Sequence, residues 1–156
     1  MERSVWFDTP VGPLTVVASD RAVTAVRFGA AGEPAASAGA STPLLRQAVG
    51  ELREYFAGMR REFSLPLAPA GTPFQQQVWA ALREIPYGRT RTYGQIAAQI
   101  GRPKACRAVG MANNRNPLAI VVPCHRVVGA SGALTGYAAG LSVKEKLLAL
   151  ESVNSE

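Results

Sequence analysis

The sequence predicts an α+β protein with a small strand-rich first part and a mostly helical second part. Residues 4–28 have strand character, whereas apolar residues at helical spacing prevail after residue 73. Between the two patterns, residues 68–73 read Ala-Pro-Ala-Gly-Thr-Pro, a composition typical of a domain boundary. We therefore expect an N-terminal sheet-plus-helix domain at residues 1–70 and a C-terminal domain at residues 71–156.

Strands are expected at three places early in the chain. Residues 4–7 and 14–18 flank the turn sequence Thr-Pro-Val-Gly-Pro, and residues 22–28 follow a second turn. Residues 62–66 are a candidate for a further strand. Residues 30–41 are rich in Ala, Gly and Ser, so we expect a loop there.

Helix start and stop signals define the longer helices. A helix is predicted over residues 43–57, with apolar residues at helical spacing and Gly58 as its stop. In the second part, Thr72 can cap a helix that has Pro73 at its first position. We expect that helix to end at the sequence Pro86-Tyr87-Gly88.

Two short helices are predicted over residues 93–100 and 104–113, separated by a turn that contains Gly101. This arrangement resembles a helix-turn-helix motif. The second helix has Arg107 among small residues, which are Ala105, Ala108, Gly110 and Ala112. A surface of small side chains fits either a nucleic-acid groove or tight packing against the protein core, and the sequence does not choose between them.

The positive charge is confined to the second half of the chain. Residues 1–70 have seven basic and seven acidic side chains, whereas residues 71–156 have ten and four. No acidic residue lies between Glu84 and Glu145. The eight basic residues in that interval are Arg89, Arg91, Arg102, Lys104, Arg107, Arg115, Arg126 and Lys144. This distribution favours a polyanion such as nucleic acid as the partner, against a basic face that only aids solubility.

Cysteine and histidine counts exclude several classes of protein. The chain has two cysteines, Cys106 and Cys124, and a single histidine, His125. A disulfide-stapled secreted scaffold, a Cys₄ zinc site and a His-rich metal site are therefore excluded. No apolar run approaches the roughly 20 residues of a membrane helix. We expect a cytoplasmic protein without a metal or an organic cofactor, in which Cys106 is a packed thiol with no bridge to Cys124.

The residues most able to perform chemistry lie at the end of the apolar run 116–127. Cys124 is followed by His125 and Arg126, so an imidazole and a positive charge stand beside a thiol. Such neighbours can activate a nucleophilic cysteine. Side chains of adjacent residues in an extended segment point to opposite faces, however, so a turn or a bridging water is needed. As an isolated dipeptide, Cys-His is more often a buried thiol beside a hydrogen-bonded imidazole.

The complete block resembles a known active-site signature. Pro123-Cys124-His125-Arg126-Val127, preceded by Asn116-Pro117, is similar to that of the methylated-DNA–protein-cysteine methyltransferases, the 6-O-alkylguanine-DNA alkyltransferases. The resemblance covers residues 72–151 and includes Phe74-Gln75, Val78-Trp79, Ile85–Gly88, Thr92–Ala97, Arg107–Gly110, Gly136-Tyr137, Lys144, Leu147-Leu148 and Glu151. It implies an N-terminal domain like ribonuclease H and a helical C-terminal domain with a helix-turn-helix or winged-helix-like motif.

The resemblance also implies a reaction and its catalytic residues. Cys124 would accept a methyl or alkyl group from 6-O-alkylguanine, and from 4-O-alkylthymine as a further substrate, after the base is flipped out of the duplex. His125 would be the base, acting through a water, and Glu151 would orient His125. Asn116 would hold the turn. The thioether product is stable, so each protein molecule would react once.

Double-stranded DNA with alkylated bases would be the partner, bound through the minor groove, and no obligate protein partner is expected. The implied DNA- or base-binding residues are Tyr93, Arg107, Arg126, Tyr137, Ala138 and Lys144. Among them, Tyr93 would contact the flipped base or its phosphate, and Arg107 would fill the gap in the stack. Each has a plainer alternative: Tyr93 as a packed surface ring, Arg107 as a phosphate contact, and Glu151 as an ion-pair partner of Lys144 or Lys146.

Ala138-Ala139 departs from the Ser or Gly that family members often have after Gly136-Tyr137. Ala138 has no hydroxyl for the leaving oxygen, and the methyl group of Ala139 would narrow the pocket. We therefore expect methyl groups to transfer well and bulky groups poorly. Three rival functions remain: a module that binds alkylated DNA without transfer, a helix-turn-helix regulator, and a thiol hydrolase that uses Cys124 and His125.

Overall fold

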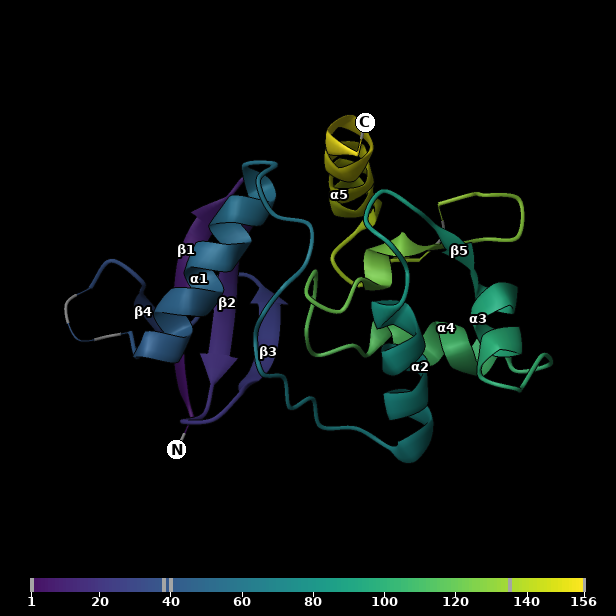
Figure 1. The fold of residues 1–156 in the computed structure, drawn as a ribbon, viewed down its shortest axis with the longest axis horizontal. Coiled ribbons are helices and arrows are strands. Elements are labelled where there is room, and N and C mark those ends of the chain that lie inside the picture. The colour runs from purple at the N-terminus through teal and green to yellow at the C-terminus, as the bar shows by residue number, and fades with distance from the viewer. Residues whose placement is uncertain (1, 38, 40, 135, 156) are drawn as a thin grey trace. The chain divides into compact units, whose positions relative to one another are not determined.

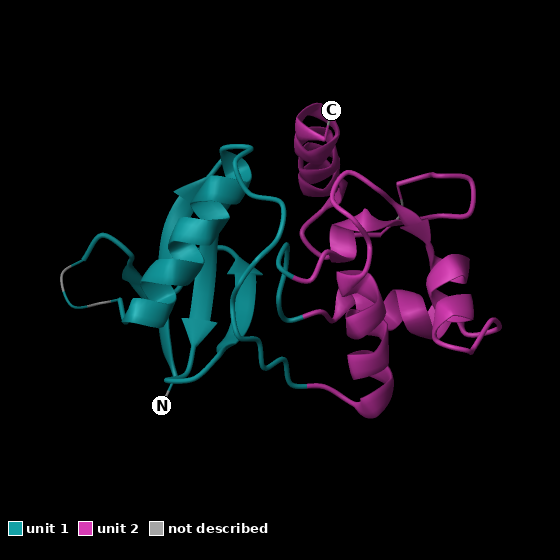
Figure 2. Cartoon of the chain, viewed as in Figure 1, with its two compact units in different colours: residues 1–70, 117–121 teal, residues 71–116, 122–156 magenta. Residues whose placement is uncertain are grey.

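A computed structural model describes residues 2–37, 39, 41–134 and 136–155 (Figure 1). The chain divides into two compact units. The first contains Met1–Ala70 and Pro117–Val121, and the second contains Gly71–Asn116 and Val122–Glu156 (Figure 2). Residues 117–121, which the sequence analysis placed in the C-terminal domain, thus belong to the first unit.

A four-stranded sheet forms the centre of the first unit. Its strands are β1 (Arg3–Thr9), β2 (Gly12–Ala18), β3 (Val23–Phe28) and β4 (Glu33–Pro34), in the order β3-β2-β1-β4. The first three strands are antiparallel and confirm the predicted ones. The short β4 pairs parallel to β1 within the segment expected to be a loop, in which residues 38 and 40 lie outside the described residues.

Two segments from later in the chain line the outer edge of β3. Val23 donates its N–H to the carbonyl of Pro66 at 2.8 Å, and Val26 donates to the carbonyl of Pro117 at 2.8 Å. The predicted strand at residues 62–66 is therefore wrong, because only an isolated bridge forms there, between Val23 and Leu67. These hydrogen bonds satisfy backbone groups that an edge strand otherwise leaves open.

Helix α1 (Pro43–Phe56) packs on this sheet and confirms the predicted helix. Thr42 caps it by accepting a hydrogen bond from the N–H of Leu45 at 3.2 Å. Its buried face includes Leu45, Leu52 and Tyr55, which complete an apolar core with the inward residues of the strands.

The second unit is mostly helical. Its elements are α2 (Pro73–Arg83), α3 (Tyr93–Gln99), α4 (Cys106–Asn114), a 3-10 turn η1 (Cys124–Arg126), α5 (Leu141–Asn154), and the two-residue parallel strands β5 (Arg91–Thr92) and β6 (Val127–Val128). Thr72 and Thr92 each form a capping box at the start of α2 and α3. Helices α2, α3 and α4 pack against one another, so the predicted pair of short helices is present.

The segment Pro117–Val121 has one unusual backbone conformation. Ile120 has a φ of 71°, in the left-handed region that β-branched residues rarely adopt, and its side chain is buried. Such strain persists only where surrounding contacts hold it. Here the N–H of Ala119 donates to the carbonyl of Val26 at 3.1 Å, which fixes the segment on β3.

Candidate active site

Cys124 lies at the start of the turn η1 and is buried, with 6% of its surface exposed. The turn resolves the geometric difficulty of adjacent side chains, because Cys124–Arg126 is not an extended segment. Asn116 supports the turn: its Nδ2 donates to the carbonyl of Val122 at 2.8 Å. Asn116 and Val122 are the residues of the second unit that directly precede and follow residues 117–121, so the bond closes that excursion of the chain.

The surroundings of Cys124 act on its thiol in opposite directions. Burial raises the pKa of the Cys124 thiol, while hydrogen bonds with Asn116 and Tyr137 and the positive charge of Lys144 lower it. The Tyr137 hydroxyl oxygen lies 3.7 Å from the sulfur. The net effect is a raised pKa, so the resting thiol is protonated at neutral pH and needs a base before it can act as a nucleophile.

His125 and Glu151 form a buried pair beside the thiol. Their atoms Nε2 and Oε2 are 2.6 Å apart, and neither side chain is more than 1% exposed. Burial lowers the pKa of His125, and this outweighs the opposite effect of Glu151, so the imidazole is neutral near pH 7. A carboxylate only accepts hydrogen bonds. The His125 proton therefore sits on Nε2, which leaves Nδ1 as the basic nitrogen.

Glu151 is kept ionised by its partners. Burial raises the pKa of its carboxyl, but hydrogen bonds and charges from His125 and Arg126 outweigh burial and bring the pKa to about 2. Arg126 donates from Nε to Oε1 at 2.8 Å and from Nη2 to Oε2 at 3.1 Å. The N–H of Gly88 donates to Oε1 at 3.2 Å. Glu151 thus pairs with His125 and Arg126 instead of the lysines considered from the sequence.

Arg126 and Lys144 were predicted to contact DNA or the flipped base, but both side chains are buried in the second unit. Arg126 is buried, and its Nη1 also donates to the carbonyl of Ile85 at 2.7 Å. Lys144 is fully buried, and its Nζ donates to the carbonyl of Val127 at 2.6 Å. Both charged groups therefore have protein acceptors inside the second unit, because long charged side chains are buried only when they are paired.

The residues expected on the DNA-facing surface lie on α3, α4 and the loop before α5. Arg107 and Ala108 are exposed on α4, and Tyr93 is half-buried at the start of α3. A Cβ atom at Gly110 would lie 3.7 Å from the Tyr93 ring, an ordinary van der Waals distance, so α4 packs closely against Tyr93 at this position. Tyr137 is half-buried, and Ala138 is exposed.

Five of the eight basic residues in the acid-free interval are exposed: Arg89, Arg102, Lys104, Arg107 and Arg115. All five belong to the second unit. Cys106 is exposed too, at the first position of α4, so its prediction as a packed thiol is wrong. Both cysteines are free thiols.

Some residues around the site were not predicted. Asn113 is buried on α4 and donates from Nδ2 to the Cys124 carbonyl at 3.3 Å, and Ile85 and Gly88 supply backbone groups to Arg126 and Glu151. The one available signal for Asn113 was its helical spacing, four residues after Val109, which is also buried.

Among the described residues, no group of three or more His, Cys, Asp and Glu side chains is placed to hold a metal ion. No described helix is long and apolar enough to cross a membrane.

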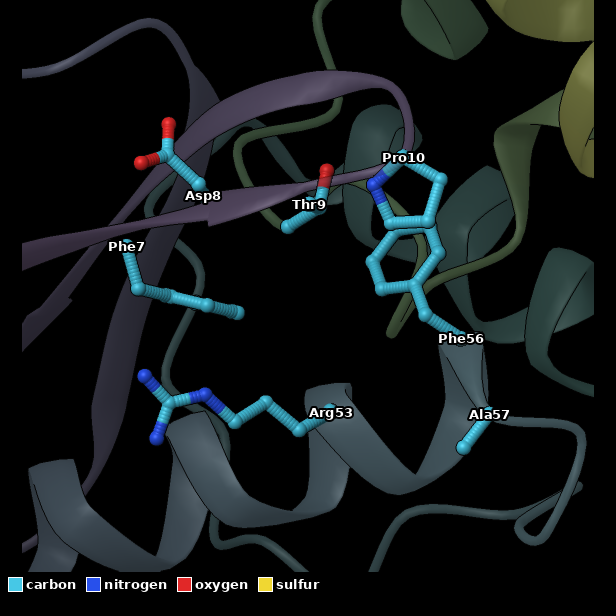
Figure 3. Close-up of a pocket in the computed structure, with 7 residues that line it drawn as sticks. All are labelled: Phe7, Asp8, Thr9, Pro10, Arg53, Phe56 and Ala57. Atoms are coloured by element: carbon cyan, nitrogen blue, oxygen red, sulfur yellow. The ribbon is translucent and has the colours of Figure 1, made fainter.

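A pocket with a volume of about 280 Å³ lies in the first unit, between the β1–β2 turn and α1 (Figure 3). Its lining residues are Phe7, Asp8, Thr9, Pro10, Arg53, Phe56 and Ala57. The guanidinium of Arg53 stands over the Phe7 ring, 5.3 Å from its centroid. This pocket contains neither a cysteine nor a histidine, so it has no counterpart of the Cys124–His125–Glu151 arrangement.

Comparison with known protein families assigns both parts of the chain. Residues 73–153 match the model described as 6-O-methylguanine DNA methyltransferase, DNA binding domain. Residues 5–69 match the model described as 6-O-methylguanine DNA methyltransferase, ribonuclease-like domain. The predicted fold, with a ribonuclease-like first domain and a helical DNA-binding second domain, is confirmed.

Individual relatives agree with the family models. The chain is 53% identical to the methylated-DNA–protein-cysteine methyltransferase of Methanosarcina acetivorans, covering 93% of this chain and 95% of the relative. It is similar to the crystal structure of Mycobacterium tuberculosis O6-methylguanine methyltransferase, with 46% identity, a TM-score of 0.88, and coverage of 100% and 96% of the two chains.

The Mycobacterium tuberculosis protein OGT has also been crystallised in complex with DNA. That structure matches with 46% identity and a TM-score of 0.87, over 97% of this chain and 94% of the other. Matches of this extent, over both units, show that the chain belongs to the 6-O-methylguanine DNA methyltransferase family.

Proposed function

We propose that this protein repairs DNA by direct reversal, transferring a methyl or alkyl group from 6-O-alkylguanine to Cys124, once per protein molecule. The observation that carries the proposal is a buried thiol on a tight turn, next in sequence to His125. The Nε2 atom of His125 lies 2.6 Å from Oε2 of Glu151. The names of the relatives support the same activity. Alkylated thymine is a further substrate of the same chemical kind.

The proton of the thiol has a defined destination. Because Nε2 of His125 donates to Glu151, Nδ1 accepts the Cys124 proton through a water molecule, and Glu151 stabilises the imidazolium that forms. Asn116, Tyr137 and Lys144 favour the thiolate at the same moment. Arg126 acts as a positioning residue, because it holds both carboxylate oxygens of Glu151.

The thiolate sulfur then attacks the saturated carbon of the alkyl group. A new S–C bond forms, and the C–O bond breaks with its electron pair remaining on the base. The imidazolium returns a proton to the base, so guanine is restored and the alkyl group replaces the hydrogen of the thiol. A thioether is not cleaved by water or by the imidazole, so the reaction ends after one event.

DNA binding follows from the basic second unit and from the family's DNA-binding domain. We infer that α3 and α4 enter the minor groove, where the small residues of α4 allow close approach. In this arrangement Arg107 fills the space left by the flipped base, and Tyr93 contacts that base or its phosphate. Tyr137 and Ala138 border the base pocket. We expect the protein to act alone, in the cytoplasm and associated with the nucleoid.

The test is to incubate the protein with duplex DNA containing labelled 6-O-methylguanine and measure the protein mass. We expect a gain of one methyl group on Cys124, and no gain in Cys124→Ala, which still binds the DNA. A shifted DNA band without a protein adduct identifies a binding module or a regulator instead. Repeated turnover on an ester or peptide identifies a thiol hydrolase.

A further inference from the structure

We propose that Asn113 is a positioning residue of the proton relay, whose side-chain oxygen accepts a hydrogen bond from the water between Cys124 and His125. This inference rests on the proposed function, because it concerns the step that activates the thiol. It assigns a role to a residue of α4 that lies outside the catalytic signature.

The hydrogen bond to the Cys124 backbone fixes the orientation of the Asn113 amide. Asn113 is 1% exposed, and its amide lies 3.3 Å from the carbonyl oxygen of Cys124. A carbonyl oxygen can only accept, so the NH₂ end of the amide must face it. The oxygen Oδ1 is therefore the other end of a side chain already anchored beside the nucleophile.

Two buried polar atoms next to Cys124 have no hydrogen-bond partner among the described residues: Oδ1 of Asn113 and Nδ1 of His125. Leaving a buried polar atom without a partner is costly, so such atoms indicate a ligand or an ordered water. Both atoms are acceptors, because Nε2 of His125 holds the imidazole proton against Glu151. They cannot bond each other, and each needs a donor.

One water molecule satisfies both acceptors and the thiol together. It donates one hydrogen to Nδ1 of His125 and the other to Oδ1 of Asn113, and it accepts the hydrogen of the Cys124 thiol. Three hydrogen bonds are typical of a buried water. In the transfer, the water gives a proton to Nδ1 and takes the thiol proton, so no atom or charge is lost. Asn113 thus holds the water in line between sulfur and imidazole.

The variant Asn113→Leu tests the relay, because leucine has similar bulk and no polar atom. The measurement is the pH dependence of Cys124 alkylation by iodoacetamide without DNA, followed by peptide mass spectrometry. Exposed Cys106 is the reference thiol in the same sample. We expect the Cys124 rate near pH 7 to fall roughly 5- to 100-fold. We also expect the pH of half-maximal rate to rise, with the alkaline plateau retained. The neighbouring variant Asn114→Leu, at an exposed position of the same helix, should leave that pH unchanged.

Other outcomes would overturn the inference. A lower rate at every pH with an unchanged midpoint would show that Asn113 only supports the backbone of Cys124. An unchanged iodoacetamide profile with slower transfer from DNA would show that it contacts the base instead.

A high-resolution crystal structure of the unaltered protein is a second test that does not depend on the variant folding. We expect a water within hydrogen-bond distance of Cys124 Sγ, His125 Nδ1 and Asn113 Oδ1, and its absence would contradict the relay. If the wild-type protein gains no methyl group from DNA, the proposed function fails, whereas the iodoacetamide profile still judges the role of Asn113.

Discussion

Among the described residues, the first unit buries one Asp, Glu, Lys, Arg or His side chain, Glu51, whereas the second buries His125, Arg126, Lys144 and Glu151. Glu51 accepts hydrogen bonds from the N–H of Ser64 at 2.8 Å and from Gln47 at 3.0 Å. Those bonds tie a loop to α1. Glu151 also stabilises local structure, but one of its partners is an imidazole that can take up a proton.

Burial of a carboxylate therefore does not by itself mark an active site. What distinguishes the second unit is that the carboxylate has a titratable partner, His125, which directly follows Cys124 in the turn η1. The first unit has a pocket with Arg53 over the Phe7 ring, yet its sequence contains neither a cysteine nor a histidine (Figure 3). Substitutions in matched pairs, one from each unit, test this distinction.

Replacement of the two buried glutamates should give the largest difference. We expect Glu151→Gln to slow alkyl transfer at least about 100-fold, because the imidazolium loses its counter-charge. It should also lower the free energy of unfolding by roughly 3–5 kcal/mol, because Arg126 is left buried without its ion pair. The measurements are single-turnover transfer kinetics and urea denaturation.

Glu51→Gln is the matched control in the first unit. It should lower the free energy of unfolding by about 1–3 kcal/mol and leave the transfer rate of the folded protein unchanged. If the two variants slow transfer equally, the distinction between a structural and a catalytic carboxylate fails.

Acid should destabilise the protein through the same network. The pKa of Glu151 is about 2 when folded and near 4.5 when unfolded. Its contribution is therefore fully present above pH 4.5 and lost as the pH falls toward 2, on the order of 3 kcal/mol. The lowered pKa of His125 adds a loss that begins below its unfolded value of 6.5, because only the unfolded chain then binds the proton.

Urea denaturation at a series of pH values measures this dependence. The slope between pH 4.5 and 2 should shrink in Glu151→Gln and persist in Glu51→Gln. The same slope in all three proteins would assign the acid sensitivity to other groups.

Arginine substitutions compare the surfaces of the two units. We expect Arg107→Ala to weaken DNA binding roughly tenfold, since one phosphate or stacking contact is lost. The slope of log K against log salt concentration should become shallower by about one unit. Its stability should change by less than about 0.5 kcal/mol, because the side chain is exposed. Fluorescence anisotropy with labelled duplex DNA measures the affinity.

Arg53→Ala, in the pocket of the first unit, should leave both DNA affinity and transfer rate unchanged. Equal losses of affinity in Arg53→Ala and Arg107→Ala would place the DNA-binding surface on both units.

The smallest effect concerns the shape of the pocket near Tyr137. We expect Ala139→Gly to increase the transfer of benzyl-sized groups about 3- to 10-fold, because a methyl group is removed, while methyl transfer stays within twofold. Competition between DNA duplexes with methyl- and benzyl-guanine measures the ratio. Comparable rates for both substrates in the wild type, unchanged by the substitution, would contradict a narrow pocket.

Helices α1 to α4 were predicted well, because their signals are local, whereas α5 (Leu141–Asn154) was not predicted. Thr42 and Thr72 each lie directly before a proline, and both cap their helices. The strand expected at residues 62–66 failed, because pairing at the edge of β3 depends on tertiary position. Whether residues 66–68 meet that edge is set by the whole unit and not by their own composition.

For the site, the resemblance identified Cys124, His125 and Glu151 together, and the structure shows that the last two are in contact. Burial of Arg126 and Lys144 was not predictable, because charged residues are exposed by default and their acceptors lie 25 and 17 positions away. The exposure of Cys106 was missed for the opposite reason, since cysteine is usually buried.

The short strap Pro117–Val121 on the edge of β3 bears on how this protein can evolve. The chain leaves the first unit after Ala70, returns at Pro117 and departs again three residues before the nucleophile. A recombination event that exchanged one half of the gene at residue 70 would pair a new sheet with an old strap, including a buried isoleucine in a strained conformation. We therefore expect both halves of the gene to have been inherited together. Among relatives, substitutions in β3 should be accompanied by substitutions in the strap.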